Sequence, residues 1–280
     1  MEFIFKEFTI VASTVLLVWK YSIGHQNMDI EFHRNFSDVL STVQKNLPDP
    51  SVGFQNSSLG SNVFNALEKF FSNTQAPVCG SIILVLSKRY PNDANISGFV
   101  AKIRSHHSIL HVMTSASPSG GSQPKSMYSV ASKTNGMGAF ETDYYFPGII
   151  SSFPLYDYRY PVYAATIQVS GSGTKTLPDF HSPVSDIYWI AITYQGHLPI
   201  NSFRNLTLRW TNPEDSESWS DNLHDVAELD GGNFEGSYSD FSAVNYSMTL
   251  AYNYSGQDVE ALQIRIYSQT SSDNWLPCSD

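Results

Sequence analysis

The spacing of apolar residues changes near residue 155, and this change limits the chain to two unlike domains. Between Ala76 and Phe140, unbroken apolar runs alternate with segments in which apolar residues recur at helical spacing. From Pro161 onward they recur at every second position, as in strands that bury one face. Parallel strands covered by helices produce the first pattern, and an antiparallel sandwich produces the second. The sequence therefore predicts an α/β region followed by an all-β region.

The α/β region is expected to alternate strands and helices. The apolar runs 79–86 and 108–113 predict parallel strands that are buried on both faces. Residues 95–103 and 125–134 are expected to be helices, and an Asn-Gly pair at 135–136 is a typical cap for the end of the second one. This order predicts a partial doubly wound sheet, in which functional sites lie at the carboxyl ends of the strands.

The expected strand ends hold no residues that would make the region catalytic. Residues 87–89 and 114–116 offer no carboxylate, no glycine-rich phosphate cradle and no nucleophile elbow. The motif G-x-S-x-G is also absent from the chain. We therefore expect no catalytic residues and no enzyme activity. The alternative is an α/β hydrolase-like enzyme that acts on sugar or lipid.

Two amphipathic helices are expected before the parallel strands. The first carries apolar residues on one face from Phe36 to Val43 and ends before a Leu-Pro pair at 47–48. Ser61 is expected to cap the second helix, which runs to Phe71, because a serine hydroxyl can accept a hydrogen bond from a free amide of the first turn.

The second region is expected to form an antiparallel immunoglobulin-like β-sandwich. Apolar and polar residues alternate in short segments that are separated by turn signals. These segments are 163–169, 187–194, 206–210, 234–241, 246–254 and 262–266. The chain lacks the Cys…Trp…Cys pattern of antibody domains, so the hypothesis excludes an antibody-like domain.

An acidic stretch separates the third and fourth of these segments. Its carboxylates are Asp215, Glu217, Asp221, Asp225, Glu228 and Asp230. The spacing of an EF-hand calcium loop, with its glycine and terminal glutamate, is missing. We therefore expect a solvated loop, and a weak calcium site is the alternative.

The first residues predict export from the cell. Residues 8–19 are almost wholly apolar, and small residues follow at Ser22 and Gly24, where a signal peptidase would cleave. The run is shorter than the roughly 20 residues of a membrane span. We expect residues 1–24 to be a signal peptide or an N-terminal membrane anchor, with a core strand as the third alternative. Either leading alternative makes the protein extracellular, secreted or anchored with its domains outside.

Two further features agree with export. Candidate glycosylation sites, which have the sequence Asn-x-Ser/Thr, occur at Asn35, Asn56, Asn95, Asn205, Asn245 and Asn253. The chain has two cysteines, Cys79 and Cys278, so one disulfide can form. We expect that bond because free thiols are uncommon in an oxidising compartment, and two reduced cysteines are the alternative.

Three segments of the α/β region resemble a von Willebrand factor A-like domain. Residues 59–67 are similar to that family's loop and helix, 78–86 to its central strand, and 127–140 to its last helix, glycine turn and edge strand. The resemblance implies an A-like domain over residues 25–153. The chain before Gly60 is too short for the usual first strand, helix and second strand, so residues 1–45 replace them or the domain is incomplete.

The resemblance also bears on metal binding. Members of the family hold a divalent cation with a D-x-S-x-S motif, a threonine and an aspartate. The motif is absent here, Ser61 aligns with the threonine, and Ser87 and Lys88 stand at the aspartate. A lysine at this position repels a cation, so we expect no metal and no other cofactor.

The whole layout resembles a family of nematode extracellular proteins. These pair an A-like domain with an immunoglobulin-like domain of unknown function, here residues 160–280, sometimes next to a C-type lectin module. Residues 77–83, 117–125 and 252–258 carry this match.

The sequence therefore predicts an extracellular, non-catalytic binding protein that acts in adhesion or host defence. Its ligand would be a protein or a glycan. The net charge of −10 argues against nucleic acid, which requires a basic face. Contact with a membrane is expected only through an N-terminal anchor. A purely structural surface component is a further alternative.

Overall fold

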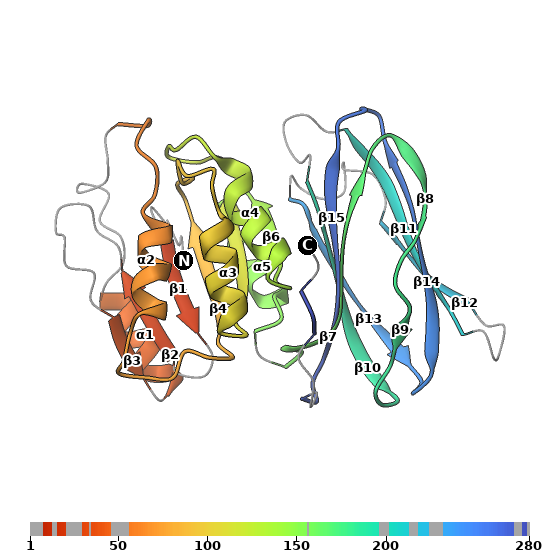
Figure 1. The fold of residues 1–280 in the computed structure, drawn as a ribbon, viewed down its shortest axis with the longest axis horizontal. Coiled ribbons are helices and arrows are strands. Elements are labelled where there is room, and N and C mark those ends of the chain that lie inside the picture. Colours follow the sequence, from red (N-terminus) through yellow and green to blue (C-terminus); the bar gives the residue numbers. More distant parts are fainter. Residues whose placement is uncertain are drawn as a thin grey trace. The chain divides into compact units, whose positions relative to one another are not determined.

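The chain divides into two compact units, Met1–Pro147 and Gly148–Ser279 (Figure 1). The computed structural model describes residues 8–12, 16–20, 30–33, 35–45, 56–155, 157–195, 202–212, 218–223, 232–271 and 276–278. The first unit contains helices and a mixed sheet, and the second is built from antiparallel strands. The predicted α/β region followed by an antiparallel sandwich is therefore confirmed.

A parallel sheet forms the part of the first unit that the apolar runs predict. Strands β4 (Ile82–Ser87), β5 (Ile109–Ser115) and β6 (Gly138–Glu141) pair in parallel. Helices α3 (Ser97–Ser105) and α4 (Pro124–Lys133) connect them. All residues of the three strands are buried, because helices and sheet neighbours leave no face of a parallel sheet open to water.

The turn after α4 has the predicted geometry. Asn135 has a φ of 57°, in the left-handed region that ends many helices. Gly136 is required for a different reason. A Cβ at this position would lie 1.8 Å from the carbonyl oxygen of Leu110, so only glycine lets the turn approach β5 this closely.

The N-terminal residues extend the same sheet. Strands β1 (Phe8–Ala12), β2 (Leu16–Lys20) and β3 (Ile30–His33) are antiparallel, and the sheet order is β3-β2-β1-β4-β5-β6. This arrangement corresponds to the core-strand alternative for the apolar run. A signal peptide or anchor, and with it export, stays a prediction. No helix among the described residues has the length and apolar character needed to cross a membrane.

Both amphipathic helices are present, and a third short helix follows the parallel strands. They are α1 (Phe36–Lys45), α2 (Val63–Phe71) and α5 (Phe146–Ser152). The predicted cap of α2 is wrong: Asn62 precedes the helix and makes no side-chain cap hydrogen bond. The amide of Ser61 donates to Tyr90 O at 2.8 Å, which keeps this serine in the preceding loop.

Two antiparallel sheets form the second unit. The first sheet contains, in order, β13 (Phe234–Phe241), β10 (Asp186–Tyr194), β15 (Glu260–Ser268) and β7 (Tyr160–Val169). The second contains β12 (Ser218–Leu223), β11 (Phe203–Thr211), β14 (Asn245–Tyr254) and β8 (Ser172–Thr176), and β9 (Phe180–His181) pairs with β14. This strand order is that of a jelly roll, which refines the expected immunoglobulin-like connectivity.

Three strands of the sandwich were missed: β9, which has two residues, and β8 and β12, which carry no apolar alternation. Every residue of β8 is exposed, so its sequence, Ser-Gly-Thr-Lys-Thr, resembles a turn. Strand β12 lies inside the stretch that was predicted to be a solvated acidic loop. Of the six carboxylates in that stretch, Asp221 belongs to β12. The other five carboxylates lie outside the described residues. Strands β8 and β12 are at sheet edges, where few neighbours demand apolar side chains.

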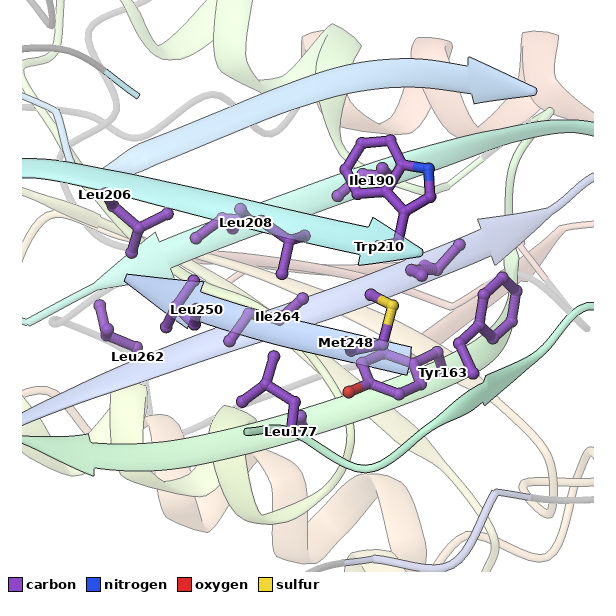
Figure 2. Packing of buried hydrophobic residues seen from close by; sticks show 14 of the residues in the cluster. Tyr163, Leu177, Ile190, Leu206, Leu208, Trp210, Met248, Leu250, Leu262 and Ile264 are labelled. Carbon is purple, nitrogen blue, oxygen red and sulfur yellow. The ribbon is translucent and has the colours of Figure 1, made fainter. Parts of the chain in front are cut away.

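The core of the sandwich lies between the sheets, as the alternation predicts. Tyr188, Ile190 and Ile192 of β10 are buried in it. Figure 2 shows Leu208 of β11 and Leu250 of β14 packed among the side chains of β15. Because alternate residues of each strand face inward, the opposite positions remain available for surface contacts.

Candidate functional site

A pocket of about 480 Å³ lies at the edge of the sandwich where β13 and β12 end their sheets. From the first sheet it is lined by Ser185, Asp186, Ile187, Asp240, Phe241 and Ser242. From the second sheet, Asn212, Trp219 and Tyr246 complete the lining. The pocket therefore needs both sheets and five separate stretches of the chain, at or beside β10, β11, β12, β13 and β14.

Strand pairing brings the first-sheet residues together. Asp186 is opposite Phe241, and Ile187 is opposite Asp240, in the antiparallel pair of β10 and β13. Residues directly opposite each other point to the same face of a sheet. The two carboxylates therefore belong to opposite faces of the first sheet: Asp186 shares the inward face with the buried Phe241, and Asp240 shares the outward face with the exposed Ile187. Both line the pocket because it lies where β10 begins and β13 ends.

Trp219 is exposed because of its position on an edge strand. It is opposite Trp210 in the pair of β12 and β11. Trp210 is only 3 % exposed, whereas Trp219 is 39 % exposed because no further strand of the described sheet covers it. The indole of Trp219 packs edge-on against Tyr246, with ring centroids 6.1 Å apart. The site thus presents a large apolar ring to solvent, held by a buried aromatic neighbour.

The polar groups of the pocket are mostly hydrogen-bond acceptors. Asp186 and Asp240 are exposed carboxylates, and Asn212 adds a side-chain amide. Ser185 Oγ accepts a hydrogen bond from the amide of Ala243 at 2.9 Å. No lysine, arginine or histidine is among the described lining residues. An aromatic face beside acceptors can hold a ring-shaped ligand that has one apolar face and several hydroxyl donors.

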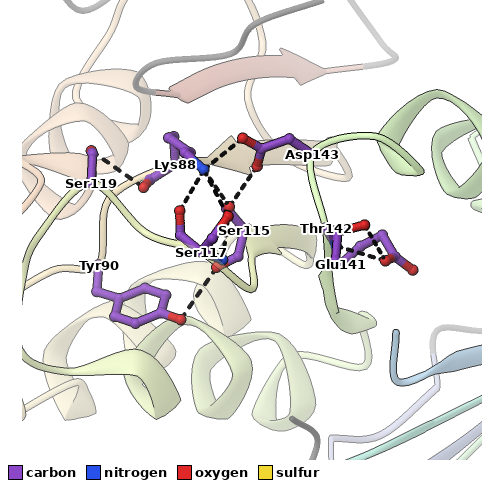
Figure 3. A network of polar contacts seen from close by, with 8 residues as sticks. All are labelled: Lys88, Tyr90, Ser115, Ser117, Ser119, Glu141, Thr142 and Asp143. Atoms are coloured by element: carbon purple, nitrogen blue, oxygen red, sulfur yellow. Dashed lines mark hydrogen bonds and ion pairs between the residues drawn. The ribbon is translucent and has the colours of Figure 1, made fainter. Parts of the chain in front are cut away.

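A second polar cluster lies at the carboxyl ends of the parallel strands. Lys88 Nζ follows β4 and contacts Asp143 Oδ2 at 2.6 Å and Ser115 Oγ at 2.9 Å. It also donates to the backbone oxygen of Ser117. Figure 3 shows the ammonium surrounded by these oxygens. The cluster closes on itself, because Ser115 Oγ donates its proton to the second oxygen of Asp143 at 2.6 Å.

This cluster offers neither an accessible nucleophile nor a vacant cation site. Ser115 is fully buried, and Lys88 is 14 % exposed. The positive charge of Lys88 already sits among the oxygens that a cation would need. Among the described residues, no group of three or more His, Cys, Asp or Glu side chains could hold a metal. The expected absence of metal and of catalytic residues stays a prediction that this geometry supports.

The two serines at the aligned metal positions make no common site. Ser61 is buried, and its hydroxyl has no hydrogen-bond partner among the residues that the structure describes. Ser87 Oγ donates to the carbonyl oxygen of Arg89 at 2.7 Å, within its own loop. Sequence reasoning missed Asp143, because it examined the ends of β4 and β5 and not the loop after β6.

The candidate glycosylation sites are all accessible. Five of the asparagines are exposed and Asn253 is partly exposed. Asn205 and Asn253 are directly opposite each other on β11 and β14, so glycans there would be close neighbours. Cys79 is exposed and Cys278 partly exposed, and both are free thiols that belong to different units. Their glycosylation and pairing stay predictions.

Sequence reasoning did not identify the pocket. Asp186 and Asp240 are isolated acidic residues in the sequence, and Trp219 lies in the stretch predicted to be a loop. The one available signal was a tryptophan within a polar, acidic segment, which is unusual for a residue with no contact to make.

Residues 165–269 match the family model of a domain of unknown function (DUF7154). No curated protein matches the chain. Among solved structures, a carbohydrate-binding module (CBM6cm-2) from Cellvibrio mixtus lichenase 5A is 11 % identical, covers 40 % of this chain and 92 % of its own, and has a TM-score of 0.24.

Two further structures are similar to the same extent. A family 35 carbohydrate-binding module from Clostridium thermocellum is 11 % identical, covers 39 % of this chain and 95 % of its own, and has a TM-score of 0.27. Eiger TNF from S. frugiperda is 12 % identical, with coverages of 42 % and 98 % and a TM-score of 0.25. At this level of similarity the three structures say nothing about a ligand of this chain.

Proposed function

We propose that the chain is a non-catalytic glycan-binding protein of the cell exterior, and that its sandwich binds a sugar in the pocket around Trp219. The observation that carries this proposal is the exposed indole of Trp219 beside the carboxylates of Asp186 and Asp240. An indole that lines a pocket beside polar groups can stack on a ligand while those groups fix its orientation.

The chemistry of the pocket suits a sugar ring. A pyranose has an apolar C–H face that can stack on the indole of Trp219. Its hydroxyl groups can donate to the exposed carboxylates of Asp186 and Asp240. The volume of about 480 Å³ is within the roughly 300–1,000 Å³ that is typical of small-ligand sites.

Two observations favour binding over the alternative of a hydrolase. In the first unit, the strand-end serine, Ser115, is buried and bonded to Asp143. In the pocket, Asp186 and Asp240 are exposed to water, whereas a glycosidase keeps its general acid in an apolar site that favours the protonated form. A binding protein needs neither an accessible nucleophile nor a general acid in an apolar site.

The apolar N-terminal run and the accessible glycosylation sites support the cell exterior as part of the proposal. A C-terminally tagged copy expressed in a eukaryotic cell should be secreted or membrane-attached, and glycosidase treatment should increase its electrophoretic mobility. A cytosolic product with unchanged mobility would contradict this part of the proposal.

The finer identity is also a proposal. The resemblance to A-like domains supports a first unit that lost its metal and uses Lys88 in its place, as the cluster with Asp143 indicates. Together with the resemblance to nematode extracellular proteins, it suggests a role in adhesion or host defence. A purely structural surface component would show no specific ligand.

Glycan binding is tested with the full chain and a matched pair of variants. Wild-type protein should bind immobilised neutral oligosaccharides, and Trp219→Ala should weaken binding at least tenfold. Tyr144→Ala is the control, because Tyr144 is an exposed aromatic residue of the first unit, 83 % exposed, outside the pocket. Binding that is unchanged in Trp219→Ala, or absent from the wild type, would overturn the proposal.

A further inference from the structure

Beside the pocket, an exposed aromatic platform lies on the outer face of the first sheet. Trp219, opposite the buried Trp210, belongs to the inner face of the second sheet, so a ligand that reaches both passes over the edge strand β13. Tyr238 of β13 is 64 % exposed. Its ring contacts Trp189 of β10, with centroids 4.5 Å apart, and Tyr158, with centroids 5.2 Å apart. An exposed ring that is held from two sides is a rigid surface on which a ligand can stack with little loss of conformational freedom.

The backbone of β13 is shaped for this platform. Gly236 is opposite Ala191, next to the indole of Trp189. A Cβ at Gly236 would lie 2.1 Å from Cζ2 of Trp189, so any other residue would displace the ring. The indole nitrogen of Trp189 is buried and has no hydrogen-bond partner among the described residues, so packing and not hydrogen bonding positions this ring there.

Strand register connects the platform to the pocket. Asp240 and Tyr238 are two residues apart on β13, so they point to the same face with Cα atoms about 7 Å apart. On β10, Ile187 is opposite Asp240, and Trp189 is opposite Tyr238. Ile187 and Asp240 line the pocket. The residue pair Ile187–Asp240 of the pocket is therefore next to the pair Trp189–Tyr238 of the platform on the same face.

Three carboxylates lie near the two sites, and the exposed guanidinium of Arg159 lies over the neighbouring ring of Tyr160. Asp186 and Asp240 line the pocket, and Asp157 precedes Tyr158 in the chain. Desolvation raises the pKa of the Tyr158 hydroxyl, and Tyr238 and these three carboxylates raise it further, which places them within electrostatic reach of the platform. Ligands with carboxylate or sulfate groups would be repelled, whereas hydroxyl and ammonium groups would be attracted.

We infer that the site takes an oligosaccharide chain without acidic groups, one sugar on Trp219 and a later sugar of the same chain on Tyr238. This inference rests on the proposed function and adds a second subsite and a ligand class to it. The stacked tyrosine would contribute only to chains long enough to reach it, so affinity should increase with chain length.

The experiment compares chain lengths by calorimetry on the full protein. The probes are the dimers and tetramers of β-1,4-linked glucose and of β-1,4-linked glucosamine. At least one tetramer should bind wild-type protein at least tenfold more tightly than its dimer. In Tyr238→Ala the tetramer should bind no better than the dimer, and in Tyr238→Phe most of the difference should remain. Tyr144→Ala should match the wild type.

The outcomes separate the inference from the proposal on which it rests. Binding that requires Trp219 but is independent of chain length, or of Tyr238, overturns the second subsite alone. Absence of binding for every probe, or binding that Trp219→Ala leaves intact, overturns both. A tetramer of galacturonate should bind at least tenfold more weakly than the best uncharged or cationic tetramer. Equal binding would overturn the ligand class.

Discussion

The polar side chains at strand ends contact one another in the first unit and are exposed to solvent in the second. In the α/β unit, Lys88, Ser115 and Asp143 satisfy one another and leave little for a ligand. In the sandwich, Asp186 and Asp240 are exposed beside the exposed ring of Trp219. Asp186 accepts a hydrogen bond from the amide of Ile187 at 2.8 Å, yet its carboxylate stays open to solvent. Polar residues at strand ends thus form a candidate binding site where the fold leaves them exposed. The difference predicts that mutations in the first cluster reduce stability and mutations in the second reduce binding.

The largest effect is expected for Lys88→Ala. It leaves the partly buried carboxylate of Asp143 without its cation, which should cost about 2–3 kcal/mol of unfolding free energy after allowance for the exposure of the pair. Urea denaturation of the full chain measures this cost. Lys69→Ala, at an exposed position of α2, is the control and should change stability by less than about 0.5 kcal/mol. An equal, small effect of both variants would break the comparison.

Trp219→Ala should produce the reverse pattern. A tenfold loss of sugar binding corresponds to about 1.4 kcal/mol of binding free energy. Because the ring is partly exposed at a sheet edge, the unfolding free energy should decrease by less than about 1 kcal/mol. Binding by calorimetry and thermal unfolding on the same protein sample provide both values. A large loss of stability would mean that Trp219 belongs to the core.

A mutation of Tyr163 tests whether burial of a residue, and not the unit to which it belongs, decides between a loss of stability and a loss of binding. It is a buried residue of the sandwich and donates to Pro178 O at 2.9 Å. Tyr163→Phe removes this bond and should cost about 0.5–1.5 kcal/mol near pH 7. Sugar binding should not change, because Tyr163 does not line the pocket.

The same residue predicts a pH dependence. Burial raises the pKa of Tyr163 above its ordinary value of about 10, with a smaller contribution from the charge of Asp179. The unfolded chain therefore loses this proton at lower pH than the folded chain. The contribution to stability is present below pH 10 and is lost as the pH rises from 10 toward the raised pKa. Unfolding measured between pH 8 and 11 should show a smaller loss in Tyr163→Phe than in the wild type.

The smallest effect is expected for Ser61→Ala. The hydroxyl of Ser61 is buried and has no partner in the described part of the chain, so its removal should leave stability within about 0.5 kcal/mol of the wild type or increase it slightly. Calorimetry with magnesium, manganese and calcium should give no heat of binding for either protein. A stoichiometric, micromolar heat that vanishes in Ser61→Ala would show that the first unit retains an open metal site.

The elements that short-range patterns control could be predicted from the sequence. The bounds of β13 were predicted exactly as observed, and β10 and β14 to within one residue. The cap at Asn135 followed from an Asn-Gly pair alone. The predictions failed where local pattern and final environment differ. Strands β8 and β12 are polar because edge strands tolerate polar side chains. Helix α2 begins after Asn62 because the amide of Ser61 donates a hydrogen bond to the backbone oxygen of Tyr90.

By itself, the sequence determined the two fold classes, most buried faces and the lack of common catalytic motifs. Fold class, buried faces and motifs depend on residues that are close in the sequence. The spacing of apolar residues shows whether a strand or helix buries one face or both. Only the tertiary structure decided where polar residues meet. Lys88 and Asp143 are 55 residues apart, and Asp186, Trp219 and Asp240 come from different strands of two sheets. Strand register determines such meetings, and register results from the packing of the whole sandwich, which no local pattern contains.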